Sequence, residues 1–132
     1  MSVTAEDLFE RAQGVRMRAH APYSHFLVGA AIEDDQGHVH VGCNVENVAY
    51  PQGACAEANA IGAMVSAGGR RIRRIAVIGG RDDPIFCAPC GGCRQRILEF
   101  ADQESEILLR HPDGRIERHT IETLLPASFK AF

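Results

Sequence analysis

Three cysteines and one glutamate have the types and spacing for chemistry at a metal ion. Cys55 and Glu57 lie two residues apart, and Cys90 and Cys93 follow further along the chain. Three thiols can hold one zinc ion and leave its fourth position open, whereas a structural zinc ion has all four positions filled by the protein. A nearby carboxylate that is not a ligand is the proton partner that a water at the open position needs. The pattern predicts a zinc site suited to hydrolysis.

The spacing also indicates how these side chains are presented. Cys90 and Cys93 are three residues apart, so at the start of a helix their sulfurs share one face. Cys55 is expected to begin another helix. Free N–H groups at helix starts carry partial positive charge and stabilise thiolates. Glu57 does not share a face with Cys55, but in a first turn its carboxylate can still reach the open side of the metal.

A second interpretation of the same cysteines is a structural zinc module without catalytic activity. Cys87 precedes the Cys90–Cys93 pair and is a possible fourth ligand, which would close the site. Cys43 falls in a predicted strand and is expected to be a buried, inert thiol. Five cysteines without a secretion signal indicate a reducing compartment, by default the cytoplasm.

The elements that must position these residues follow from hydrophobic periodicity. Helices are predicted from Thr4 to about Ala19, from Cys55 to Ala67 and from about Gly91 to Phe100. Strands are predicted at 27–32, 39–41, 75–78, 107–109 and 115–120, with a short helix at 121–125. This order predicts one α/β domain over residues 1–132, with helices on both faces of a mixed five-stranded sheet.

Composition limits the class of partner. The chain has 132 residues, 45% of them hydrophobic, and a formal net charge of −3, which argues against a nucleic-acid partner. The one basic run, Arg70–Arg74, is expected to be a solvated strand entrance. No apolar run is long enough to cross a membrane. A small polar substrate is therefore the expected ligand.

The neighbouring residues carry a resemblance to a known family. Cys-Ala-Glu at 55–57 followed by Pro-Cys-Gly-Gly-Cys at 89–93 resembles the signature of the zinc-dependent cytidine deaminase superfamily. Segments 23–31, 42–50, 89–95 and 124–129 are similar to those of its small, homotetrameric nucleoside deaminases. The resemblance covers nearly the whole chain, in order, and implies a three-layer α/β/α fold of the cytidine deaminase type.

The resemblance implies a role for individual residues. Cys55, Cys90 and Cys93 would bind one zinc ion per subunit, and Glu57 would carry protons between water and the pyrimidine. Ala56 would hold the base through its backbone, and Phe26 would pack on it. Asn44 and Glu46 would bind the ribose hydroxyls, and their spacing of two in a strand would send both side chains to one face. Other residues near the site would be Tyr50, whose role stays open, and Phe129, which would reach a neighbouring subunit's site in a homotetramer.

The implied reaction is hydrolytic deamination of cytidine and deoxycytidine to uridine and deoxyuridine in pyrimidine salvage. A modified cytosine nucleoside such as blasticidin S is the alternative substrate with the same chemistry. The chain departs from the family pattern at Ala58, where arginine commonly follows the catalytic glutamate and offsets the thiolate charge. We expect the helix dipoles, and Arg94 or another basic side chain, to compensate here.

Overall fold

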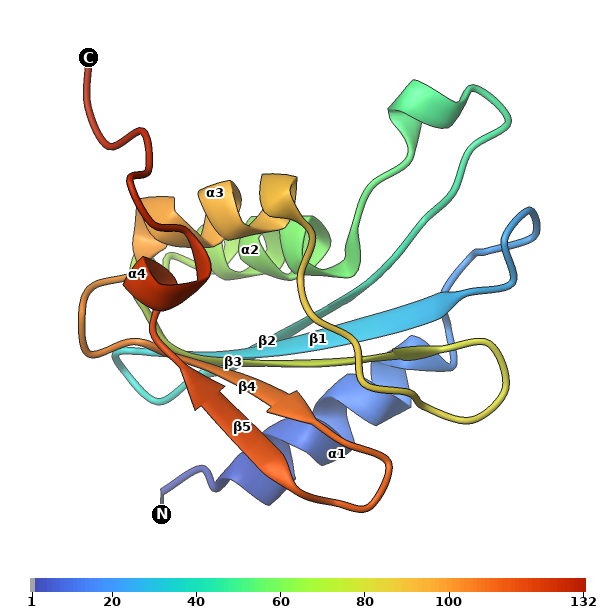
Figure 1. Ribbon diagram of the computed structural model, residues 1–132, viewed down its shortest axis with the longest axis horizontal. Coiled ribbons are helices and arrows are strands. Elements are labelled where there is room, and N and C mark those ends of the chain that lie inside the picture. The colour runs from blue at the N-terminus through green and yellow to red at the C-terminus, as the bar shows by residue number, and fades with distance from the viewer. Residues whose placement is uncertain (1) are drawn as a thin grey trace.

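A five-stranded mixed sheet forms the centre of the protein, for which a computed structural model describes residues 2–132 (Figure 1). The strand order is β2-β1-β3-β4-β5. Strands β3 and β4 pair in parallel, whereas β1–β2, β1–β3 and β4–β5 are antiparallel pairs. The strands are β1 (Leu27–Asp34), β2 (Val39–Cys43), β3 (Ile72–Gly80), β4 (Glu106–Arg110) and β5 (Ile116–His119).

Helices cover both faces of the sheet, as the sequence predicted. Helix α1 lies on one face, and α2, α3 and the short α4 lie on the other (Figure 1). The helices are α1 (Ala5–Arg16), α2 (Ala56–Ser66), α3 (Gly91–Phe100) and α4 (Ile121–Leu124), and a 3₁₀ turn, η1, spans Tyr50–Gln52. The three-layer α/β/α prediction is therefore confirmed. Within residues 2–132, no helix combines the length and apolar character needed to span a membrane.

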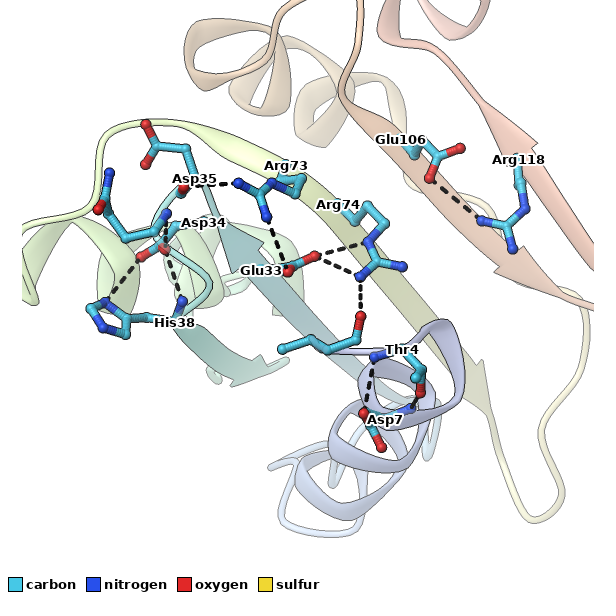
Figure 2. A network of polar contacts seen from close by, with 12 residues as sticks. Thr4, Asp7, Glu33, Asp34, Asp35, His38, Arg73, Arg74, Glu106 and Arg118 are labelled. Atoms are coloured by element: carbon cyan, nitrogen blue, oxygen red, sulfur yellow. Dashed lines mark hydrogen bonds and ion pairs between the residues drawn. The ribbon is translucent and has the colours of Figure 1, made fainter. Parts of the chain in front are cut away.

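Helix starts and ends obey local rules that are visible in the sequence. Thr4 caps α1: its hydroxyl accepts from Asp7 N at 3.1 Å, and the Asp7 carboxylate accepts from Thr4 N at 2.9 Å (Figure 2). Helix α1 ends at Arg16, one turn earlier than its apolar spacing predicted. Helix α2 ends before Gly68, whose φ of +99° suits the residue that follows a helix.

Two apolar clusters hold the layers together. The larger lies between the sheet and α2, α3 and α4, and the smaller lies between the sheet and α1. Gly42 on β2 lets α2 approach the sheet closely, since a Cβ built there would lie 2.7 Å from Ala56 O and still nearer to Ala60 N. The start of α2, with Cys55 and Glu57, is thereby fixed against β2.

Three of the four arginines in the basic run at 70–74 pair with carboxylates of the protein. Arg74 pairs with the buried Glu33 at 2.7 Å, and Arg73 lies 3.6 Å from the same carboxylate (Figure 2). Arg71 pairs with Asp102 at 2.7 Å. These arginines stabilise the entrance of β3, which confirms the structural interpretation of the run.

Candidate zinc centre and substrate cleft

Two helix starts bring the three predicted zinc ligands together. Cys55 is the N-cap of α2, Cys90 is the N-cap of α3, and Cys93 lies in the first turn of α3. Their three sulfur atoms all lie within 4.8 Å of one another. Tetrahedral zinc with Zn–S bonds of about 2.3 Å needs sulfurs roughly 3.8 Å apart, so this donor set fits the ion.

The electrostatics of the thiols are those of a site that needs a cation. The pKa of Cys90 is lowered, chiefly because the Cys93 N–H donates to its sulfur at the start of α3. Burial raises the pKa of Cys55 and of Cys93, and the side chain of Cys93 is fully buried. A metal ion allows all three thiols to be thiolates together, because binding of the metal releases the protons of the thiols.

Glu57 lies beside this cluster in the first turn of α2. Its side chain is buried, only 4% exposed, and burial raises its pKa above the ordinary value. Hydrogen bonds from its own N–H and from Cys93, and the charge of Arg96, oppose that rise. A carboxyl group with a raised pKa is suited to accept and return protons near neutral pH.

A cleft of about 390 Å³ opens in front of the thiols and Glu57, within the size range of small-molecule sites. Most residues predicted for the metal, the base and the sugar line this cleft: Phe26, Asn44, Glu46, Cys55, Ala56, Glu57 and Cys90. Cys93 and Phe129 are not part of the lining. A larger hollow of about 620 Å³ lies between α1 and the turns near Ile85 and Arg110. Because that hollow contains none of the thiols, we place the site in the smaller cleft.

Asn44 and Glu46 are held in place by the protein yet keep hydrogen-bonding capacity. The Asn44 amide accepts from Val28 N and donates to Phe26 O, both at 2.8 Å, which leaves one amide hydrogen free. One oxygen of Glu46 accepts from the N–H groups of Tyr23 and Ser24, and the other accepts from the Ser24 hydroxyl. A donor and an acceptor side by side suit two adjacent hydroxyls.

These two residues lie just beyond β2, not within it as predicted, since β2 ends at Cys43. The backbone stays extended because Val45, between them, forms bridges to His20 and Ala54. Asn44 and Glu46 therefore both line the cleft, as their spacing implied.

Phe26 and Cys87 form one wall of the cleft over Gly79. A Cβ built on Gly79 would lie 2.7 Å from the Cys87 sulfur and 3.1 Å from the Phe26 ring. Burial raises the pKa of Cys87 to about 11, so this thiol stays protonated at neutral pH. In the described part of the chain, Cys87 is outside the group of close metal-binding atoms. The geometry therefore argues against the closed structural site.

Two predicted residues lie apart from the thiols. Tyr50 lines the outer cleft and packs edge-on against Tyr23, with ring centroids 5.9 Å apart. Phe129 is 61% exposed on the tail after α4 and does not line the cleft of its own chain. The side-chain amide of Gln95 donates a hydrogen bond to the Phe129 carbonyl oxygen, with Nε2 and O 3.0 Å apart.

Sequence reasoning missed one residue that supports the rim of the cleft. Arg16 is 1% exposed at the end of α1. Its guanidinium donates to Leu27 O at 3.2 Å, next to Phe26, and to Gly80 O and Asp82 O at 2.8 Å, on the loop that leads to Cys87. The sequence analysis does not single out Arg16, because only the tertiary structure brings these carbonyls to it.

Sequence also left open which cation lies near the thiolates. Arg94 turns away from them and donates to Pro89 O and Leu124 O at 2.8 and 2.9 Å. Arg96 instead lies beside Cys93, with its Nη1 3.7 Å from the sulfur. The spacing of three between Cys93 and Arg96 was the available signal.

Comparison with known proteins agrees with this geometry. The model of the cytidine and deoxycytidylate deaminase zinc-binding region matches residues 2–108. A cytidine deaminase of Sporosarcina psychrophila is 40% identical over 124 residues, which cover 94% of this chain and 90% of that protein. The crystal structure of cytidine deaminase from Burkholderia pseudomallei is similar with a TM-score of 0.87 and 39% identity, covering 96% of this chain and 100% of that one. That from Mycobacterium tuberculosis is similar with a TM-score of 0.85 and 38% identity, covering 98% and 100%. The chain belongs to the cytidine and deoxycytidylate deaminase family of zinc-dependent hydrolases.

Proposed function

We propose that this protein catalyses the hydrolytic deamination of cytidine and deoxycytidine to uridine and deoxyuridine, with release of ammonia. One observation carries the proposal: three thiols spaced for one zinc ion and a buried carboxyl group, Glu57, meet at one cleft. Cys55, Cys90 and Cys93 would hold the ion. When bound, zinc supplies a Lewis acid that lowers the pKa of a water ligand toward neutrality.

Glu57 is the proposed proton carrier. Its carboxylate takes a proton from the attacking water and delivers it to the pyrimidine ring nitrogen. It then transfers a second proton to the amino group, which leaves as ammonia while the oxygen of water remains on the ring. The burial of Glu57 supports this role, because burial raises the pKa of the acid above its ordinary value.

The remaining lining of the cleft suits a nucleoside. Phe26 offers an apolar wall for the base, and the backbone at Ala56 lies at the start of α2, next to the ligand Cys55. We assign the free amide hydrogen of Asn44 and the carboxylate of Glu46 to the two sugar hydroxyls. Deoxycytidine retains only one of these hydroxyls, so it is expected to bind with a higher KM.

We further propose a homotetramer in which Phe129 of one subunit reaches the cleft of another. Support comes from apolar side chains that lie exposed around the cleft mouth and on the tail. Val48 and Tyr50 are 79% and 75% exposed, and Phe129 is 61% exposed. Such exposed apolar groups are typical of surfaces that a partner covers.

A cytoplasmic role in pyrimidine salvage fits the chemistry of the chain. All five cysteines are free thiols in the described structure, as expected in a reducing compartment. The arginines of the basic run are paired with carboxylates or backbone carbonyls, which favours a free nucleoside over nucleic acid. We regard residues 1–132 as one catalytic domain.

The test is an absorbance assay of zinc-loaded protein with cytidine, deoxycytidine, cytosine and blasticidin S. We expect turnover of the first two, its loss on chelation and its return with zinc. Exclusive turnover of blasticidin S would replace the substrate assignment, and cytidine turnover that survives complete zinc removal would contradict the zinc mechanism.

Glu57→Gln tests the proton carrier separately from the metal. The variant should keep zinc, since Glu57 is not a ligand, and lose roughly 10²- to 10⁴-fold in kcat. Zinc content is measured alongside turnover. A Glu57→Gln protein with normal turnover would remove Glu57 from the mechanism.

A further inference from the structure

The proposed zinc site contains more negative charge than the metal can balance. Three thiolates exceed the charge of a Zn²⁺ ion by one unit. The family pattern places an arginine directly after the catalytic glutamate, but this chain has Ala58, whose methyl group provides no charge. Each helix start carries about half a positive charge, but the start of α2 also has the carboxylate of Glu57 in its first turn, so the two starts offset only part of the total negative charge.

Arg96 is placed to supply the missing charge from the other helix. It lies one turn after Cys93 on α3, and its Nη1 is 3.7 Å from the Cys93 sulfur. The Cys93 side chain is fully buried, so water does not solvate this sulfur.

The other arginine of this turn is engaged elsewhere. Arg94 donates to Pro89 O and Leu124 O and therefore holds the loop before α3 and the end of α4. Arg96, in contrast, donates to the sulfur of the proposed zinc ligand Cys93. Hydrogen bonds to sulfur ligands from outside the coordination sphere tune the metal that they hold.

We propose that Arg96 replaces, from α3, the charge that an arginine after the catalytic glutamate supplies from α2 in the family pattern. Arg96 is a positioning residue: it donates to Cys93, stabilises that thiolate as a zinc ligand and balances the cluster. The inference rests on the proposed zinc site, and it adds that Ala58 and Arg96 form a compensating pair.

Zinc affinity tests this pair independently of turnover. Zinc-loaded protein is titrated with a chromophoric chelator, and the dissociation constant is measured for the unaltered chain, Arg96→Met, Arg96→Lys and Ala58→Arg/Arg96→Met. Arg96→Met should bind zinc roughly 10- to 100-fold more weakly. Arg96→Lys should retain most of the affinity, and the added Ala58→Arg should restore most of what Arg96→Met loses. Arg118→Met is the matched control, because it removes one exposed guanidinium that pairs with Glu106 on the sheet, and it should leave zinc affinity unchanged.

Three results would overturn the inference. If Arg96→Met binds zinc as tightly as the unaltered chain, Arg96 does not balance the charge of the thiolate ligands. An equal loss of zinc affinity in Arg96→Lys and Arg96→Met would show that the charge of Arg96 does not cause the effect. The same conclusion would follow if adding Ala58→Arg to Arg96→Met restored no zinc affinity. If the unaltered protein binds zinc but does not deaminate cytidine, the proposed function fails while the affinity series still decides the role of Arg96.

Discussion

Gly42→Ala should disturb the zinc centre although Gly42 itself does not line the cleft. The new Cβ would lie 2.7 Å from Ala56 O and 2.8 Å from the Asn59 carbonyl carbon, whereas ordinary contacts of a Cβ begin near 3.4 Å. Both neighbours are backbone atoms of α2, so no side chain can rotate away. The helix itself must withdraw from β2 by close to an ångström, and it carries Cys55 with it.

The expected cost is large for a single methyl group. Overpacking costs typically 1–3 kcal/mol, and the rigid backbone places this case near about 3 kcal/mol. An unfolding entropy of about 2.1 cal/mol/K per residue gives roughly 0.28 kcal/mol/K for this length. The melting temperature should therefore fall by about 11 °C. Zinc binding should weaken as well, because metal–ligand distances tolerate only about 0.2 Å.

Gly62→Ala is the matched control on the same helix. Nothing lies within 4 Å of a Cβ built there, and the residue is exposed. Removing a glycine from a helix interior should stabilise by about 0.4–1 kcal/mol, or about 1–4 °C. Thermal unfolding and zinc content are measured for both variants. Equal melting temperatures and zinc contents for Gly42→Ala and the unaltered chain would refute the close seating of α2.

Two further predictions concern the cleft wall and acid stability. Gly79→Ala should push the Cys87 thiol and the Phe26 ring into the cleft and raise KM for cytidine by roughly tenfold, equivalent to about 1.4 kcal/mol, with zinc content unchanged; steady-state kinetics with an unchanged KM would contradict the wall assignment. Burial alone raises the pKa of Asp34, but hydrogen bonds from His40 and from backbone N–H groups outweigh it and hold the pKa below the usual 3.8. The charge of Asp34 therefore stabilises the fold above about pH 4 and ceases to do so as the pH falls through the lower folded pKa. Asp34→Asn should melt lower than the unaltered chain at pH 7, and the gap should shrink below pH 4; a gap that is constant from pH 7 to pH 3 would contradict the shift.

The helices that hold the thiols were predictable because their signals are local. The spacing of Cys90 and Cys93, the proline before them and the glycine after Ala67 are all visible within one or two turns, and α3 begins and ends where predicted. Strand ends were less predictable: β3 runs from Ile72 to Gly80, well beyond the apolar run at 75–78. Its arginines at 73 and 74 belong to the sheet because Glu33 on β1 pairs with them.

The residues of the candidate site also fall into two groups, one revealed by local sequence pattern and one that depends on contacts between distant segments. Cys55, Glu57, Cys90 and Cys93 form a pattern that sequence alone reveals, since their chemistry fixes their types. Arg96 was left among several basic candidates, because its contact with the Cys93 sulfur depends on the direction of its side chain in the folded protein. Contacts between distant segments carry no signal at sequence spacing, and the structure alone assigns them.

The bonds of Arg16 have a consequence for the order in which the protein folds. Its acceptors lie at the start of β1, at the end of β3 and on the loop after β3, and those segments meet only once β1 and β3 have paired. Until then the guanidinium is better solvated by water than by an incomplete set of carbonyls. We therefore expect the rim of the cleft to be completed late in folding and to open before the paired strands when the native protein fluctuates. Amide hydrogens of the loop at 81–86 should consequently exchange with solvent faster than those of β3 itself.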